Sequence, residues 1–523
     1  MGSVTRAEWK WAAGFSAAVA VLLTLPYLFA YQTQGKDWRF SGFLFGVEDG
    51  NSYIADMRQG ADGAWLFRIP YTTEPQTGSM IYLPYLWLGK LAGGAAMHDQ
   101  LVALFHLALV AAGFAMLLSV YRFTACFIES VPLRRWALAA AAFGGGLGWI
   151  LLAAHSYPLE FTSPEAFGFL SLFGLPHLAA ARALFLLALA WFAEPFDAAA
   201  AGRRGVRIGL ALTAVWLFQP ITVGVAWAVM AAGIALMFLR LRLRREPAAV
   251  MRPRLTSWLV ATAVSALPMA YSAFSFAADP VLRQWAAQNT LTSAPIGQYL
   301  LSYGPLLLPA LAGAVIAWRE DERWLIPLGW MIVFPLLIYL PFTVQRRLAE
   351  GFWMALIVLA LRWVEKKLAG AARMAAFVAG MALLLPAAVL FTGWAFMRAA
   401  VPSKPAFLPA AEARALEWLD SQTSTDAVVV SGFAAGNAVP AYTGLLTYIG
   451  HGPETLNNRE KQIRVDALFN GALDDASRLD ALRTIGADYV LAGPVELATM
   501  GETLPGCELI YRKDGWEIWR VVV

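Results

Sequence analysis

Two adjacent acidic residues, Glu48 and Asp49, stand out in a chain that is otherwise poor in charge. They lie in the segment 46–53, which follows the first long apolar run of the sequence. A carboxylate can accept a proton from a substrate hydroxyl, and carboxylate oxygens are ligands that suit a divalent cation. The alternative is structural, because the same charges would favour the positive end of a helix that begins at Asn51. The pair therefore predicts either acid–base chemistry or a helix start.

The composition is that of a membrane protein. Of the 523 residues, 59% are hydrophobic and 15% are charged, and the mean hydropathy is +0.56. A helix that crosses a bilayer needs about 20 mainly apolar residues. Eleven segments meet or approach this length: 11–31, 101–121, 136–155, 177–195, 206–220, 221–239, 256–277, 298–318, 324–342, 352–365 and 372–397. We therefore predict a polytopic α-helical membrane protein with about 11 transmembrane helices.

The basic residues predict how the chain is oriented. Lys and Arg accumulate on cytoplasmic loops, and with a cytoplasmic N-terminus most basic clusters fall on that side. The largest is the run 240–254, for which topology is a sufficient explanation, so we expect no nucleic-acid partner. The segment 79–97 is apolar too, but as a crossing it would turn the basic loops outward. It is therefore predicted to lie at the outer interface.

The outer side holds several loops and the tail of the chain. The first outer loop covers 32–100, and further outer regions are 156–176, 278–297, 343–351 and everything after about 398. Because charge rises after Pro402, we predict a transmembrane domain at 1–400 and a soluble extracytoplasmic α/β domain at 401–523. In this domain helices are expected at 412–419, 459–469 and 477–485, and strands at 427–431, 445–450, 488–491, 508–511 and 516–521. Cys126 and Cys507 fall on opposite sides, so no disulfide is expected between them.

The absence of several motifs from the sequence limits the kinds of reaction that the protein could catalyse. It contains no Walker motif, no zinc-ligand spacing and no nucleophile elbow. An enzyme on the outer face would therefore need a substrate that carries its own activation energy. A lipid-linked donor meets that need, because nucleotide sugars are cytoplasmic.

The arrangement resembles the GT-C superfamily of polyprenyl-phosphate-sugar glycosyltransferases, in particular the protein O-mannosyltransferase and aminoarabinose transferase branch and its bacterial relatives. That superfamily places an acidic motif after the first span, then interfacial helices, and often a soluble domain after the last span. Glu48-Asp49 takes that place here, with 52–65 and 79–97 as candidate interfacial helices. The order Glu-Asp departs from the Asp-Glu of the best-known branches. Further segments similar to bacterial relatives are 143–149, 175–177, 345–347 and 410–522.

The resemblance implies a sugar-transfer reaction in which different residues act on the acceptor and on the donor phosphate. A base must take the proton from the acceptor hydroxyl, and cations must hold the phosphate as negative charge develops on it. We assign the base to Asp49, with Glu48 either helping or binding a divalent cation. The phosphate candidates are Arg346 and Arg347 at the outer end of a span, and Arg182 within a span. The alternatives are interfacial snorkelling for the adjacent pair and a structural ion pair for Arg182.

Three further residues are candidates for acceptor or metal binding. Glu160 and Glu165 lie in the second outer loop without a basic neighbour, and His177 lies near the outer end of a span. Oxygen ligands would suit Mg²⁺ or Mn²⁺, although spacing alone defines no metal site. The alternatives are solvated loop charge for the acids and a hydrogen-bonded core residue for the histidine. Four side chains of the tail are candidates for stacking on sugar, with core packing as the alternative: Tyr442, Tyr448, His451 and Trp516.

Together these features predict a multi-pass glycosyltransferase of the bacterial plasma (inner) membrane, with a cytoplasmic N-terminus and an extracytoplasmic C-terminal domain. It would move a sugar from a polyprenyl-phosphate donor to a lipid, glycan or protein acceptor on the outer face, surrounded by membrane lipids. The alternative is a transporter or flippase of lipid-linked sugars, since many spans and intramembrane charge also fit translocation. Transporters usually show repeated halves, and the sequence has no convincing internal repeat.

Overall fold

The structure, a computed structural model, describes residues 4–423 and 426–522. The chain forms two compact units, each built from separated stretches of sequence. Unit 1 comprises Met1–Thr24, Leu107–Ala273 and Thr290–Trp394, and unit 2 comprises Leu25–His106, Phe274–Asn289 and Ala395–Val523. Most of the first outer loop therefore belongs to the same unit as the tail. The predicted domain boundary at residue 400 stays a prediction.

Long apolar helices make the chain an integral multi-pass membrane protein. Within 4–423 and 426–522, seven helical segments are long and apolar enough to cross a membrane: α1 (Arg6–Thr33), α4 (Met97–Ala125), α5 with η1 (Val131–Ala154), α8 (Pro176–Ala193), α10 (Pro220–Arg244), η2 with α11 (Ala248–Ala278) and α13 (Ile296–Ala317). An eighth is α16 (Gly370–Leu384) with α17 (Pro386–Ala400), which are bent by 40° relative to each other. The remaining three predicted segments form helices that are shorter or carry more charge: α9 (Ala198–Phe218), α14 (Leu325–Leu337) and α15 (Phe352–Lys367).

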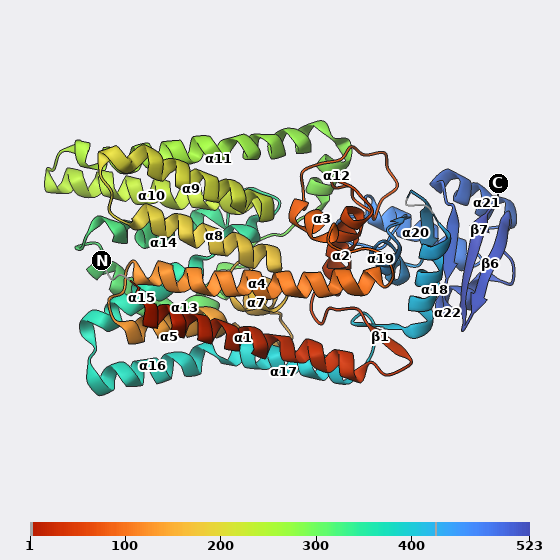
Figure 1. Ribbon diagram of the computed structural model, residues 1–523, viewed down its shortest axis with the longest axis horizontal. Coiled ribbons are helices and arrows are strands. Elements are labelled where there is room, and N and C mark those ends of the chain that lie inside the picture. The colour runs from red at the N-terminus through yellow and green to blue at the C-terminus, as the bar shows by residue number, and fades with distance from the viewer. Residues whose placement is uncertain (1–3, 424–425, 523) are drawn as a thin grey trace. The chain divides into compact units, whose positions relative to one another are not determined.

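The helices of unit 1 pack in pairs around aromatic side chains. In Figure 1 they lie side by side, with α13 against α15, α10 against α14 and α8 against α9. Phe334 of α14 stacks on Phe352 of α15, with ring centroids 3.7 Å apart. Proline starts α8 and α10, because the first helical residues have no use for their backbone N–H groups. Short helices join the long ones: α6 (Leu159–Thr162), α7 (Phe169–Gly174), η3 (Glu322–Trp324) and η4 (Gln345–Ala349).

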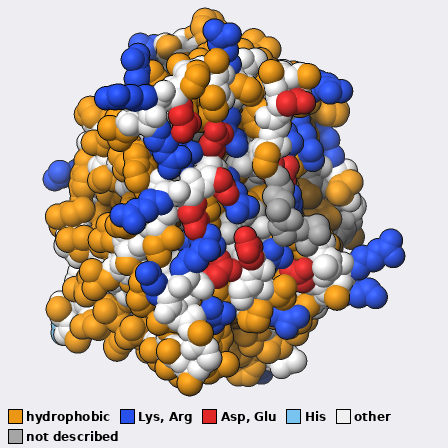
Figure 2. Space-filling model, turned by 90° about the vertical axis from the view of Figure 1, so that its left-hand side faces the viewer, with side chains coloured by type: hydrophobic (Ala, Val, Ile, Leu, Met, Phe, Trp, Pro, Cys, Tyr) orange, Lys and Arg blue, Asp and Glu red, His pale blue; other side chains and the backbone are white. Residues whose placement is uncertain are grey.

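Arginines of the predicted cytoplasmic segments are partly neutralised by acids. Arg134 Nη1 lies 2.7 Å from Glu8 Oε1, and Arg204 Nη1 lies 2.8 Å from Glu194 Oε2. Figure 2 shows one face of the molecule, on which Lys and Arg side chains alternate with Asp and Glu among hydrophobic side chains. Such pairing reduces the repulsion between gathered cations. The orientation of this chain in the membrane stays a prediction.

Unit 2 combines pieces of the predicted first and third outer loops with the tail. The strand β1 (Trp38–Phe40) pairs antiparallel with β2 (Phe407–Pro409), and two helices follow, α2 (Val47–Ala61) and α3 (Leu83–Gly89). The apolar segment 79–97 thus forms a short helix and no span, as predicted. A further short helix, α12 (Pro280–Gln288), comes from the third outer loop.

The tail folds as a mixed sheet with helices. The strand order is β4-β3-β5-β7-β6, with β4, β3 and β5 parallel and β7 and β6 antiparallel to their neighbours. The strands are β3 (Val428–Ser431), β4 (Leu446–Thr447), β5 (Tyr489–Ala492), β6 (Cys507–Lys513) and β7 (Trp516–Val521). The helices are α18 (Ala410–Gln422), α19 (Phe433–Thr443), α20 (Asn458–Phe469), α21 (Asp475–Ile485) and α22 (Pro494–Met500).

The predicted elements of the tail are confirmed. Each of the expected helices and strands is present with shifts of a few residues at its ends. Asp514 and Gly515 both have positive φ, 52° and 77°, which is the turn that an Asp-Gly hairpin requires. The sequence did not predict α19, whose Gly436 and Pro440 lower helix propensity, nor α22, nor the pairing of β1 with β2.

Candidate active site at the start of helix α2

Glu48 and Asp49 occupy the first turn of α2. The helix begins at Val47, after Gly46 in a left-handed conformation, so the expected start at Asn51 is wrong by four residues. Asp49 is 61% exposed and Glu48 is 44% exposed. Carboxylates in the first turn of a helix interact favourably with the positive end of its dipole. Gly50 is required by packing, because a Cβ there would lie 2.4 Å from the ring of Phe43.

The tail contacts both acids within unit 2. Glu48 Oε1 accepts a hydrogen bond from the backbone N–H of Gly452 at 2.5 Å, and the Glu48 carbonyl accepts one from Asn437 Nδ2 at 3.3 Å. The ring of His451 lies between the acids, with Nε2 3.4 Å from Asp49 Oδ1 and Nδ1 3.8 Å from Glu48 Oε1. A segment about 400 residues away in the sequence therefore completes the surroundings of the acids.

His451 itself is almost fully buried. Burial opposes a second proton on the ring, but the carboxylates of Glu454, Asp49 and Glu48 outweigh it and raise the pKa of His451 to about 9. Tyr442, Tyr448 and Trp516 are buried as well, which agrees with core packing rather than with exposed stacking surfaces. Sequence reasoning had grouped His451 with these aromatic residues. No signal in a single sequence pairs it with Asp49.

A second pair of acids is buried beneath the first. Asp56 of α2 is 0% exposed and Glu454 is 4% exposed. Glu454 Oε1 accepts a hydrogen bond from Ser52 Oγ at 2.9 Å, whereas Glu454 Oε2 and both carboxyl oxygens of Asp56 have no partner in the described part of the chain. Burial raises the pKa of Asp56 well above its ordinary value, and the charge of Glu454 adds to the rise. Burial likewise raises the pKa of Glu454, although His451 opposes this.

Asp56→Asn is expected to stabilise the protein, and more so at alkaline pH. A carboxyl whose pKa is raised by folding contributes stability below its unfolded pKa and loses it as the pH rises through the folded pKa. The amide does not titrate, and its NH₂ can donate to the unpartnered Glu454 Oε2. We expect a gain of about 1–3 kcal/mol in the free energy of unfolding at about pH 8 and a smaller gain at about pH 5.

The measurement for Asp56→Asn is the thermal midpoint of purified protein at both pH values. The exposed Asp480→Asn is the matched control, and its difference from wild type should not change with pH. A difference for Asp56→Asn that is constant, or that shrinks as the pH rises, would contradict the raised pKa of Asp56.

Unit 1 brings the predicted Arg182 together with Glu350 and with backbone carbonyls of the predicted second outer loop. Arg182 is buried and donates from Nε to Glu350 Oε1 at 2.6 Å. Its terminal nitrogens donate to three backbone carbonyls of the second outer loop, those of Pro164, Glu165 and Phe167. The arrangement fixes this loop to α8 and to Glu350, two residues before α15. A phosphate-binding role for Arg182 stays a prediction.

Arg346 and Arg347 lie in η4, in the short outer loop before α15. Arg347 Nε is 3.8 Å from Glu165 Oε1, and its side chain is 33% exposed. Arg346 Nε is buried and has no hydrogen-bond partner among the described residues. Arg347 is thus drawn toward Glu165, and Arg346 retains an unused donor.

Glu160 binds a glycine-rich turn. Its Oε1 accepts hydrogen bonds from the N–H groups of Gly146 and Gly148 at 3.0 and 2.9 Å, and its Oε2 accepts one from Ser302 Oγ at 3.0 Å. A Cβ on Gly148 would lie 2.1 Å from Glu160 Oε2. This contact explains why position 148 is a glycine. Half-buried His177 lies in the first turn of α8, and the structure does not bring it into a metal site with Glu160 and Glu165.

Across 4–423 and 426–522, no three His, Cys, Asp or Glu side chains are arranged to hold a metal ion. The use of Mg²⁺ or Mn²⁺ stays a prediction. Cys126 and Cys507 are both free thiols.

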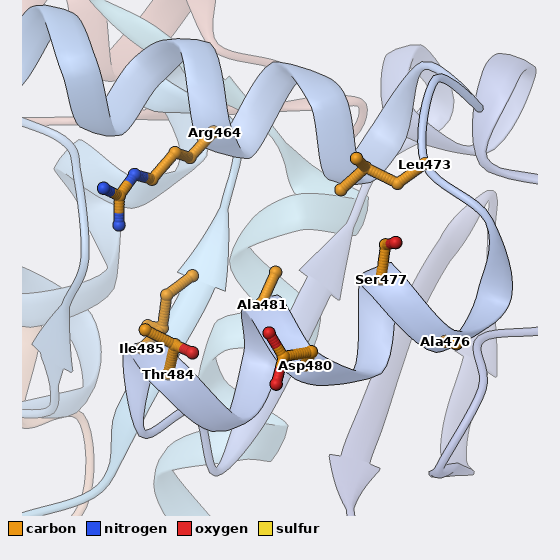
Figure 3. A pocket seen from close by; sticks show the side chains of 8 residues that line it. All are labelled: Arg464, Leu473, Ala476, Ser477, Asp480, Ala481, Thr484 and Ile485. Carbon is orange, nitrogen blue, oxygen red and sulfur yellow. The ribbon is translucent and has the colours of Figure 1, made fainter.

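A surface pocket of about 570 Å³ lies elsewhere in the tail, between α20 and α21. Figure 3 shows Arg464 of α20 across from Asp480, Ser477 and Thr484 of α21, with aliphatic side chains between them. It shares no lining residue with the acidic site.

Comparison with known proteins identifies the fold. No protein-family model matches the chain, and no curated protein is similar in sequence. Among solved structures, the archaeal oligosaccharyltransferase AglB from Archaeoglobus fulgidus, in complex with an inhibitory peptide and a dolichol-phosphate, matches over 99% of this chain and 75% of its own, with 14% identity and a TM-score of 0.54. The arabinofuranosyltransferase AftD from Mycobacteria matches over 97% of this chain and 40% of its own, with 15% identity and a TM-score of 0.54.

A third structure, ArnT from Cupriavidus metallidurans in the apo state, matches over 97% of this chain and 98% of its own, with 10% identity and a TM-score of 0.51. At these identities the likeness shows the fold alone. That fold is the GT-C fold of membrane glycosyltransferases, which confirms the resemblance at the level of architecture.

Proposed function

We propose that the protein is an integral-membrane glycosyltransferase that moves a sugar from a polyprenyl-phosphate donor to an acceptor on the outer face of the membrane. The observation that carries this proposal is Asp49, an exposed carboxylate at the start of α2 that the tail contacts through His451. The fold supports it, since a GT-C fold is common to the three transferases compared above. A fold alone does not determine a function, so the proposal depends on the residues of the site.

The reaction exchanges one bond for another. The acceptor oxygen forms a bond to the anomeric carbon as the bond from that carbon to the phosphate oxygen breaks. Asp49 takes the proton of the acceptor hydroxyl, and polyprenyl phosphate leaves with the bonding electrons. Arg346 and Arg347 are the candidates for holding the phosphate, because guanidinium groups match phosphate oxygens with several fixed donors.

The donor class follows from chemistry and from one relative. AglB was solved with a dolichol-phosphate, and a long-chain polyprenyl phosphate is the same kind of ligand. We also propose the finer topology: eleven spans, an N-terminus in the cytoplasm and a tail outside a bacterial plasma membrane, where the acceptor is a lipid, a glycan or a protein.

The test is transfer by the purified wild-type protein in nanodiscs. A panel of radiolabelled polyprenyl-phosphate sugars is offered with cell-envelope acceptors, and the label is followed into the acceptor fraction. We expect label from at least one donor to enter the acceptor. Folded protein that transfers none of the donors would contradict the proposal.

One observation favours the second candidate, a flippase of lipid-linked sugars. The α16–α17 pair is bent by 40°, and broken helices are common in transporters. In sealed vesicles a flippase would move labelled donor across the bilayer without consuming it. Movement without transfer would select this alternative.

A further inference from the structure

The segment 450–455 of the tail is held in place by both other parts of unit 2. On one side, Gly452 N–H donates to Glu48 Oε1 at 2.5 Å. On the other side, Gln288 of α12 donates to the carbonyls of Pro453 and Thr455 at 2.6 and 2.9 Å. The Thr455 hydroxyl accepts from the His451 N–H at 3.1 Å and closes the turn. The position of His451 is therefore determined by several independent contacts.

The ring of His451 has one nitrogen turned to each side of the site. Nδ1 lies 3.2 Å from the backbone N–H of Glu454, and this contact needs a lone pair on Nδ1. The proton then resides on Nε2, which faces Asp49 Oδ1 at 3.4 Å. A second proton, which the surrounding carboxylates favour, would occupy Nδ1 and remove the lone pair that faces the Glu454 N–H. Both protonation states carry the proton on Nε2, so the contact with Asp49 does not depend on which one is present.

The exposed Asp49 lies next to a group of buried titratable residues. Asp49 is 61% exposed, whereas His451, Glu454 and Asp56 are 3%, 4% and 0% exposed. The groups that face His451 are Glu48, Asp49 and Glu454, with the Tyr71 ring 5.2 Å away. Asn51 Nδ2 and Ser52 Oγ donate to Asn437 Oδ1 and Glu454 Oε1 at 2.8 and 2.9 Å, so α2 is joined to the tail at two further points.

We propose that His451 is a positioning residue for Asp49, so that a segment of the C-terminal domain completes the catalytic centre of the first outer loop. The inference rests on the proposed function, because it concerns the base of that reaction. An exposed Asp at a helix start has several open rotamers. The buried Nε2–H of His451, whose nitrogen is 3.4 Å from Asp49 Oδ1, favours the rotamer that keeps this oxygen beside the ring.

The size of the effect follows from geometry. A misplacement of about 1 Å at a reacting group costs up to about 10²-fold in rate. Without His451, the Asp49 side chain could turn to other rotamers, whereas the binding of the donor would not change. The turnover number is therefore expected to fall about 10- to 100-fold, with the Michaelis constant for the donor unchanged.

The test compares His451→Gln with His451→Asn. The Gln amide nitrogen can occupy the place of Nε2 and donate to Asp49, whereas the Asn amide reaches only the place of Nδ1. We expect His451→Gln to retain most of the turnover and His451→Asn to lose it like His451→Ala. A structural role alone would not rank the two amides in this way.

His98→Ala is the matched control. His98 is another buried histidine of unit 2, with Nδ1 3.1 Å from the Ala441 carbonyl, and its loss should lower the thermal midpoint without changing turnover. Equal turnover of wild type, His451→Gln and His451→Asn would overturn the inference and leave the proposed function standing. A folded wild type that is inactive with every donor would overturn both.

Discussion

Asp49→Asn is expected to lower the turnover number by about 10²- to 10⁴-fold, the usual contribution of a general base. The amide keeps the shape of the side chain and a carbonyl oxygen toward His451, but it cannot accept the proton of the acceptor hydroxyl. The Michaelis constant for the donor should stay the same, because the base acts on the acceptor. Steady-state transfer kinetics with one active donor provide the measurement.

The control for Asp49→Asn is another acid in the first turn of a helix, one that lies outside the candidate active site. Asp475 lies exposed in the first turn of α21, and Asp475→Asn removes the same interaction with a helix dipole. Both variants should lose about 0.3–1 kcal/mol of stability. Only Asp49→Asn should lose transfer. Full activity of folded Asp49→Asn would leave Asp49 as a helix-start charge, the structural alternative.

Arg182→Met is expected to lower the free energy of unfolding by about 3–5 kcal/mol, the cost of breaking a buried ion pair from one side. Glu350 is 0% exposed, so its charge would remain without its partner. The carbonyls of Pro164, Glu165 and Phe167 would also lose their donors. Denaturant or thermal unfolding of purified protein measures the loss.

Two comparisons make the Arg182 result specific. The double variant Arg182→Met with Glu350→Met should recover part of the loss, because no uncompensated charge remains. Arg347→Met should cost about 0–1 kcal/mol, because its pairing with Glu165 at 3.8 Å is one-third exposed. An Arg182→Met protein with wild-type stability and no transfer would contradict the structural role and favour phosphate binding.

Local patterns in the sequence predict the fold well where neighbours decide the structure. The Asp514-Gly515 turn and the apolar β-strands of the tail depend on residues close in sequence, and they are confirmed. The long apolar helices are confirmed for the same reason. The start of α2 was misplaced at Asn51, because Gly46 takes a left-handed conformation that composition does not reveal.

The candidate site is only partly predictable, because its contacts join distant segments. Glu48 and Asp49 are visible from their charge, but Gly452 lies 404 residues from Glu48. Glu160 had no basic neighbour in the sequence, yet backbone N–H groups of Gly146 and Gly148 satisfy it. Asp56 gave no signal, because its unusual property is burial beside Glu454 and a single sequence does not show burial.

The central claim is that this protein consumes a polyprenyl-phosphate sugar in a reaction that needs Asp49. The most direct measurement is the release of polyprenyl phosphate from a panel of labelled donors, with wild type and Asp49→Asn side by side in nanodiscs. We expect wild type to release polyprenyl phosphate from at least one donor and Asp49→Asn to release none. Equal release by both proteins would contradict the role of Asp49. A folded wild type that moves intact donor across vesicles and releases no polyprenyl phosphate would contradict the proposed function.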